Sequence, residues 1–100
     1  MIYTLSFHPK ALDEYKAASI WYETQQMGLG VRFEKAIDHK IKQILLNPLA
    51  FSKNRISYRQ ARTAIFPFVI VYRLNEQKLE VYISAIYHTS RNPRGKYRKQ

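Results

Sequence analysis

The sequence predicts an α+β fold in which a helical hairpin covers one face of a four-stranded, mostly antiparallel sheet. Three observations predict it: a short strand pattern near the N-terminus, two helical patterns directly after it, and three strand patterns in the second half. One hundred residues are enough for one hydrophobic core. We therefore expect a single domain over residues 1–100, with residues 93–100 as a basic C-terminal tail.

The first strand is predicted over residues 2–7, where apolar and polar side chains alternate. Proline follows at position 9, where it ends a strand and suits the first turn of a helix. Residues 10–26 then carry apolar side chains at helical spacing. Asp13 and Glu14 are expected in the first turn of this helix, where its dipole favours negative charge.

The second helix is predicted over residues 31–46, with apolar side chains three and four positions apart. Gly28-Leu29-Gly30 separates the two helices, and one of its glycines is expected to cap the first helix at its C-terminus. Asn47-Pro48 ends the second helix. So short a link predicts an antiparallel hairpin of helices, whose apolar faces need a sheet to cover.

The strand predicted over residues 64–73 is apolar on both faces and is therefore expected to be central and covered on both sides. Pro67 cannot donate to a strand ladder, so we expect a bulge or an unpaired position there. One face of this central strand carries Phe66, Phe68, Ile70 and Tyr72, and the other carries Ile65, Val69 and Val71.

The strand predicted over residues 55–62, which precedes the central strand in the chain, alternates and has one basic face.

The last strand is predicted over residues 78–88, after a turn at Asn75-Glu76-Gln77. Strict alternation assigns its side chains to two faces. One face carries Leu79, Val81, Ile83, Ala85 and Tyr87, and the other carries Lys78, Glu80, Tyr82, Ser84, Ile86 and His88.

The charge is unevenly distributed. The chain carries a net charge of +10, yet residues 1–40 hold five acidic and five basic side chains, so the whole excess lies in residues 41–100. Such a basic half indicates a polyanionic partner, namely nucleic acid, an acidic protein segment or a membrane surface. A soluble domain that is merely basic is the alternative.

Several functional classes are not indicated by the composition. The chain has no cysteine and only three histidines, far apart at His8, His39 and His88, so neither a metal site nor another cofactor is expected. No apolar run is long enough to span a membrane, and the N-terminal stretch does not resemble a signal peptide. The simplest expectation is a cytoplasmic protein without a membrane partner.

One candidate activity is cleavage of a phosphodiester bond. No carboxylate lies between Ile41 and Asn75, so a site on the sheet would combine arginines, which hold the phosphate, with a proton-transferring histidine or tyrosine. The catalytic candidates are His88, Arg73, Arg59 and Tyr87. The alternatives are structural: a strand-end histidine bonded to a loop, an exposed strand-end arginine, and a tyrosine packed in the core.

Binding without catalysis needs only the basic side chains and the tyrosines interleaved with them. Lys53 and Lys99 extend two basic stretches of the sequence. The residues expected to bind the target are Arg55, Arg59, Arg62, Arg91, Arg94, Lys96 and Arg98. A solvated charged face is the alternative interpretation.

Five short motifs follow one another along nearly the whole chain: Trp21-Tyr22-Glu23, Gly28-Leu29-Gly30 with Phe33, Asn47-Pro48, FPFVIVYR at residues 66–73, and HTSRNP at residues 88–93. In order and spacing they resemble the RelE/ParE toxin superfamily of type II toxin–antitoxin modules. The pattern is more similar to the ParE side and its plasmid-stabilisation relatives.

The resemblance implies a small α+β toxin and a cognate antitoxin that is acidic where it binds the toxin. ParE-like members poison DNA gyrase, whereas RelE-like members cleave messenger RNA in the ribosome. Some RNA-cleaving relatives use a carboxylate on the sheet with an arginine and a C-terminal histidine. Here His88 would match that histidine and Arg73 or Arg59 the arginine, but the carboxylate has no counterpart. The resemblance thus favours a gyrase inhibitor, with a metal-independent, ribosome-dependent endoribonuclease as the alternative.

Overall fold

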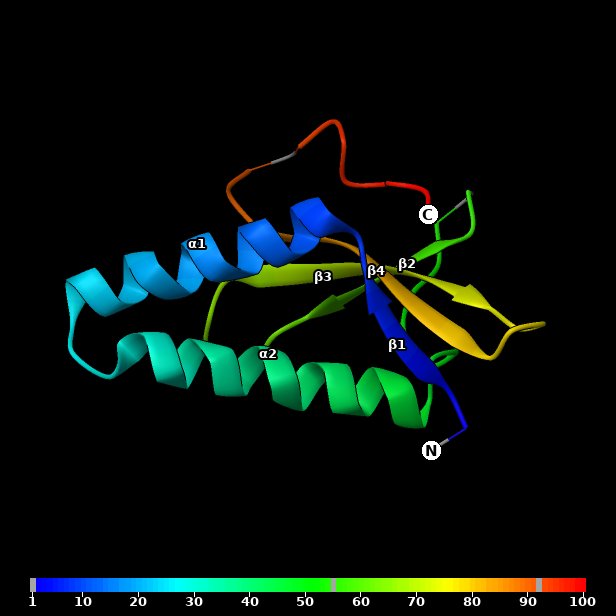
Figure 1. Cartoon of the computed structure of the whole chain (residues 1–100), viewed down its shortest axis with the longest axis horizontal. Coiled ribbons are helices and arrows are strands. Elements are labelled where there is room, and N and C mark those ends of the chain that lie inside the picture. Colours follow the sequence, from blue (N-terminus) through cyan, green and yellow to red (C-terminus); the bar gives the residue numbers. More distant parts are fainter. Residues whose placement is uncertain (1, 55, 92) are drawn as a thin grey trace.

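The computed structural model describes residues 2–54, 56–91 and 93–100. The chain forms a helical hairpin on one side of a four-stranded sheet, and after the last strand an irregular segment turns back along the molecule (Figure 1). Its last residue, Gln100, donates a hydrogen bond to the Glu80 carboxylate at 2.5 Å. The elements in order are β1 (Thr4–Phe7), α1 (Pro9–Gln25), α2 (Leu29–Leu46), β2 (Tyr58–Arg62), β3 (Phe68–Asn75) and β4 (Glu80–His88).

The sheet has the strand order β1-β4-β3-β2. β2, β3 and β4 form an antiparallel meander, and β1 pairs in parallel with β4, so the sheet is mixed. The two helices supply the length that a parallel connection between β1 and β4 requires. The predicted α+β class, with helices on one face of a four-stranded sheet, is confirmed.

Helix α1 begins at Pro9, one residue earlier than predicted, because His8 acts as its N-cap. The His8 side chain accepts a hydrogen bond from the backbone N–H of Lys10, at 3.0 Å. The expectation that Asp13 and Glu14 lie in the first turn is wrong, since the helix has already completed that turn before them.

The link between the helices is organised by Glu23. Its carboxylate accepts the backbone N–H groups of Gly28 and Gly30, at 2.8 and 2.9 Å. The predicted glycine cap on α1 is wrong: Gln26 caps α1, and Gly28, at φ +85°, is instead the N-cap of α2. A left-handed backbone at this position extends α2 two residues beyond its predicted start, to Leu29, and it suits glycine because glycine has no Cβ.

The core facing the helices is continuous from the helical hairpin to the sheet, as the periodicities predict. From α2 it takes Phe33, Ile37, Ile41, Ile44 and Leu45, and from the sheet and the turn before β3 it takes Phe66, Phe68, Ile70, Tyr72, Val81, Ile83 and Ile86. The opposite, open face carries a second buried group of Tyr58, Val69, Val71 and Ala85.

The two apolar faces predicted for the central strand are therefore confirmed, except at Ile65. Strand β3 begins at Phe68 rather than at residue 64, and Ile65 lies in the preceding turn with φ 72° and an exposure of 87%. Pro67 also precedes the strand, and its carbonyl accepts the N–H of Thr89 at 2.8 Å. Strand β2 likewise begins later than predicted, at Tyr58, because Asn54 and Ser57 form a turn before it.

Strand β4 contains a bulge at Ser84, which the predicted alternation missed. Val71 pairs with Ala85 whereas the next residue, Tyr72, pairs with Ile83, so Ser84 has no partner on β3. The extra residue shifts the alternation, and from Ala85 onward the side chains change faces. The two predicted faces of β4 are therefore wrong beyond Ile83: Ile86 packs toward the helices and Ala85 toward the open face.

The predicted basic tail has no regular secondary structure, but its last five residues lie across the open face of the sheet. We call residues 96–100 the C-terminal strap. The hydroxyls of Tyr58 and Tyr82 donate to the carbonyls of Arg98 and Lys99, at 3.0 and 3.3 Å, and the Ser84 hydroxyl donates to the carbonyl of Lys96. The ring of Tyr97 lies 5.2 Å from that of Tyr58.

Replacing Gly30 with alanine is expected to destabilise the fold by about 1–3 kcal/mol, because overpacking forces the backbone to shift. A Cβ at Gly30 would lie 2.6 Å from the carbonyl oxygen of Ser19, whereas a Cβ at Gly95 would meet its nearest atom at 3.9 Å. Chemical denaturation of Gly30→Ala beside the control Gly95→Ala measures the difference. Equal stability of the two variants would contradict the close helix packing.

Candidate functional site

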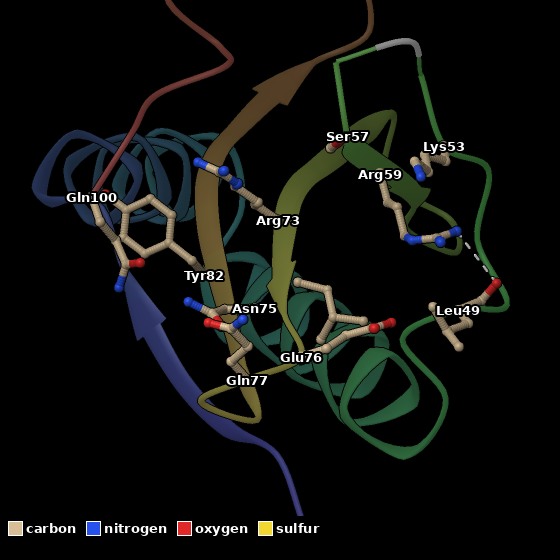
Figure 2. Close-up of a pocket in the computed structure, with 11 residues that line it drawn as sticks. Leu49, Lys53, Ser57, Arg59, Arg73, Asn75, Glu76, Gln77, Tyr82 and Gln100 are labelled. Carbon is tan, nitrogen blue, oxygen red and sulfur yellow. Dashed lines mark hydrogen bonds between the residues drawn. The ribbon is translucent and has the colours of Figure 1, made fainter.

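A groove of about 480 Å³ lies at the end of the sheet where β3 turns into β4. It contains two of the predicted catalytic residues, Arg59 and Arg73, with Lys53, Glu76 and Tyr82 beside them (Figure 2). β2 is shorter than β3, so the last residues of β3, Leu74 and Asn75, have no partner on the β2 side and line this groove. Basic, acidic, polar and apolar side chains all line the groove.

Arg73 belongs to the open face of the sheet. It pairs with Tyr58 on β2 and with Tyr82 on β4, and its guanidinium lies 5.8 Å from the centre of the Tyr58 ring. Among the described residues, no ion pair or hydrogen bond of the Arg73 side chain is found. Its N–H donors are thus available to an anionic group that enters the groove.

Arg59 extends to the other side of β3, as Figure 2 shows. Its Nη1 donates to the carbonyls of Phe51 and Leu49, at 2.8 and 3.4 Å, so its charge is partly committed to the loop after α2. Arg59 pairs with Tyr72 on β3, whose buried hydroxyl donates to the carbonyl of Pro48 at 2.6 Å. Burial raises the pKa of Tyr72 to about 12 although the nearby Arg59 acts in the opposite direction.

His88 and Tyr87 lie at the opposite end of the sheet. His88 pairs with Phe68, at the start of β3, whereas Arg73 lies five residues further along that strand. Five residues of an extended strand span roughly 17 Å. The four predicted catalytic residues are therefore not brought together into one site.

The surroundings of His88 and Tyr87 match the structural alternatives for these residues. His88 Nδ1 accepts the backbone N–H of Ser90 at 3.0 Å, and its ring lies edge-on to Phe68 at 5.4 Å. The Tyr87 ring packs on the open-face group, with the Lys96 ammonium 5.3 Å from its centre. Burial raises the pKa of the groove tyrosine, Tyr82.

The predicted target-binding residues separate into distinct environments. Arg62, Arg91 and Arg94 are exposed, and Arg62 lies at the same end of the sheet as the exit from β4. Lys96 lies near both Tyr87 and Tyr97, at 5.3 and 5.2 Å from their ring centres. Arg55 lies outside the described residues.

Arg98 points into the protein. Its two terminal nitrogens donate to the two carboxylate oxygens of Glu14, both at 3.1 Å, and Nη1 also donates to the carbonyl of Ser84 at 3.0 Å. Only 14% of the Arg98 side chain is exposed. The geometry thus assigns Arg98 to holding the strap, a role that its place in a basic run did not indicate.

The sequence analysis also missed the partner of Arg98. Glu14 and Arg98 lie 84 positions apart, and no spacing rule connects them.

Within residues 2–54, 56–91 and 93–100, no group of three metal-ligating side chains is found. No helix in the same part of the chain is long and apolar enough to cross a membrane.

Comparison with known proteins places the chain in a family. The sequence model of the ParE toxins of type II toxin–antitoxin systems, parDE, matches residues 5–93. The chain belongs to this family. The resemblance to the RelE/ParE superfamily that the five motifs carry is therefore confirmed, and the protein is the toxin component of a type II module.

The fold is similar to those of toxins from both branches of the superfamily. The intact RelBE toxin–antitoxin complex of E. coli has a TM-score of 0.66 at 20% identity, over 89% of this chain and 99% of that chain. The chromosomal ParDE system of P. aeruginosa has a TM-score of 0.63 at 18% identity, over 87% and 96%. The isolated E. coli RelE toxin has a TM-score of 0.64 at 21% identity, over 90% and 87%. No curated protein sequence matches the chain significantly.

The raised pKa of Tyr72 predicts a loss of stability in alkali. Unfolded tyrosine ionises near its ordinary pKa of 10.0 and folded Tyr72 near 12, so its stabilising contribution is complete below pH 10 and is lost as the pH rises toward 12. The free energy of unfolding of the wild type should fall more steeply over this interval than that of Tyr72→Phe. Parallel curves would show that Tyr72 ionises normally.

Proposed function

We propose that this toxin inhibits DNA gyrase by binding it, without catalysing a reaction. The main support is the separation of His88 from Arg73 by most of the length of β3, because general acid–base catalysis needs its groups within hydrogen-bond reach of one substrate. The match to the ParE family supports the choice of gyrase, since ParE-like members of the superfamily act on it.

We assign the target contact to a basic rim made of Arg62, Arg91, Arg94 and Lys96. The first three side chains are exposed; Arg62 is the last residue of β2, and Arg91 and Arg94 follow the end of β4 in the chain. Positive charge concentrated in one region favours encounter with an acidic surface. The same charge would attract an acidic segment of a cognate antitoxin, and the solved relative in complex with its antitoxin supports such a partner.

The proposal predicts that loss of charge from the rim weakens gyrase inhibition. The double variant Arg91→Gln/Arg94→Gln should need about tenfold more protein to inhibit supercoiling, because two exposed charges contribute together to encounter and binding. His88→Ala should inhibit as the wild type does. The readout is the relaxation state of plasmid DNA after incubation with gyrase, ATP and each purified variant.

The matched control is Lys16→Gln/Lys35→Gln, which removes the same charge from exposed positions on α1 and α2. It should keep full inhibition if the location of the charge matters. Equal weakening by both double variants would mean that only net charge acts. Complete loss with His88→Ala would contradict the binding mechanism.

The groove supports one alternative, a ribosome-dependent endoribonuclease. Arg73 offers uncommitted donors there, and Lys53 and Arg59 also line the groove. In that case the protein would cleave messenger RNA on ribosomes and leave gyrase active, and Arg73→Gln would abolish cleavage. Pulse labelling of DNA and protein synthesis shortly after induction separates the two functions, since a gyrase inhibitor stops DNA synthesis first.

A further inference from the structure

The strap is bound to the open face by side chains that contact its backbone. Hydroxyls from β2 and β4, on Tyr58, Tyr82 and Ser84, each donate to a different strap carbonyl. Because three hydroxyls from two strands converge on a segment without secondary structure, the sheet fixes the path of that segment in space. The strap is therefore a positioned element of the fold.

The Ser84 bulge supplies the centre of this attachment. A bulged residue has no partner in the ladder, so its backbone and side chain are available for other bonds. Ser84 is fully buried, its hydroxyl also accepts the N–H of Arg98 at 3.3 Å, and its carbonyl accepts the Arg98 guanidinium. The bulge in β4 therefore provides the hydroxyl and the carbonyl of Ser84 that bind Arg98.

Glu14 completes the attachment from α1. β1 ends opposite Ile83, so the edge of β4 beyond that residue has no neighbouring strand. The Glu14 carboxylate fills this edge: its Oε1 accepts the N–H of Ile86 at 3.0 Å while the carboxylate accepts two bonds from Arg98. A bidentate, largely shielded ion pair is geometrically specific as well as strong.

We propose that Glu14 is a positioning residue of the toxin, which holds Arg98 and so places the strap, with the basic rim that leads into it, for contact with the target. This inference rests on the proposed function in one respect, that the toxin acts by contact through its basic rim. Lys96 is itself an anchored residue of the strap and Arg94 lies two residues before it, so release of Arg98 would loosen the attachment of Lys96 and of the chain that leads to it.

The test compares Glu14→Gln with Asp13→Asn, an exposed neighbour that removes the same charge from α1. Glutamine keeps an oxygen that can accept the Ile86 N–H but loses the bidentate ion pair with Arg98. The strap should therefore detach from the open face of the sheet more often. Trypsin cleavage after Lys96, followed by mass spectrometry, should accelerate about tenfold in Glu14→Gln, and potency in growth arrest and gyrase inhibition should fall by a similar factor. Asp13→Asn should match the wild type in all three measurements.

Tyr58→Phe provides a second, milder variant in case Glu14→Gln does not fold. It leaves the ring and Glu14 in place and removes only the hydroxyl bond to the Arg98 carbonyl. It should shift cleavage and potency in the same direction by a smaller factor.

Two results would overturn the inference. Unchanged cleavage in Glu14→Gln would mean that the pair does not hold the strap, and a released strap with full growth arrest would mean that its position is irrelevant to toxicity. A wild type that arrests growth without inhibiting gyrase would refute only the choice of target, because growth arrest still measures the effect of each variant.

Discussion

The structure depends on the fact that its central strands are apolar on both faces. Strand β3 directs Ile70 and Tyr72 toward the helices and Val69 and Val71 toward the other side, and all four are buried. Burial of apolar area is the main favourable term in folding, so a sheet of this kind needs two covers. The helical hairpin provides one cover, and the C-terminal strap, with Tyr97 against Tyr58, provides part of the other.

The two covers are joined through one carboxylate. Glu14 belongs to the helical layer, Arg98 to the strap, and the Ile86 N–H to the sheet between them, so all three layers meet at Glu14. The bulge at Ser84 makes this meeting possible, because it frees the groups that receive the strap. The C-terminal strap consequently has a fixed place on the molecule, which suits the proposed contact with the target.

Most of the fold was predictable because its elements are periodic. The helical spacing in α2 and the two-sided apolar pattern of β3 identified the core and the layer order directly from the sequence. That two-sided pattern also required a second cover, yet no segment was assigned to it, since the strap has neither helical nor strand periodicity. The bulge was missed because one inserted residue shifts an alternation without leaving any pattern of its own in the sequence.

The candidate site was less predictable, since it depends on pairings between distant residues. The antiparallel register of β3 and β4 places His88 opposite Phe68, at the far end of the hairpin from Arg73. The most direct measurement compares the full chain with a chain that ends at Gly95. If the strap is the second cover of the sheet, removing it should lower the free energy of unfolding by about 2 kcal/mol or more, because buried hydroxyls lose their partners and apolar side chains are exposed. Equal stability of the two chains would contradict this account.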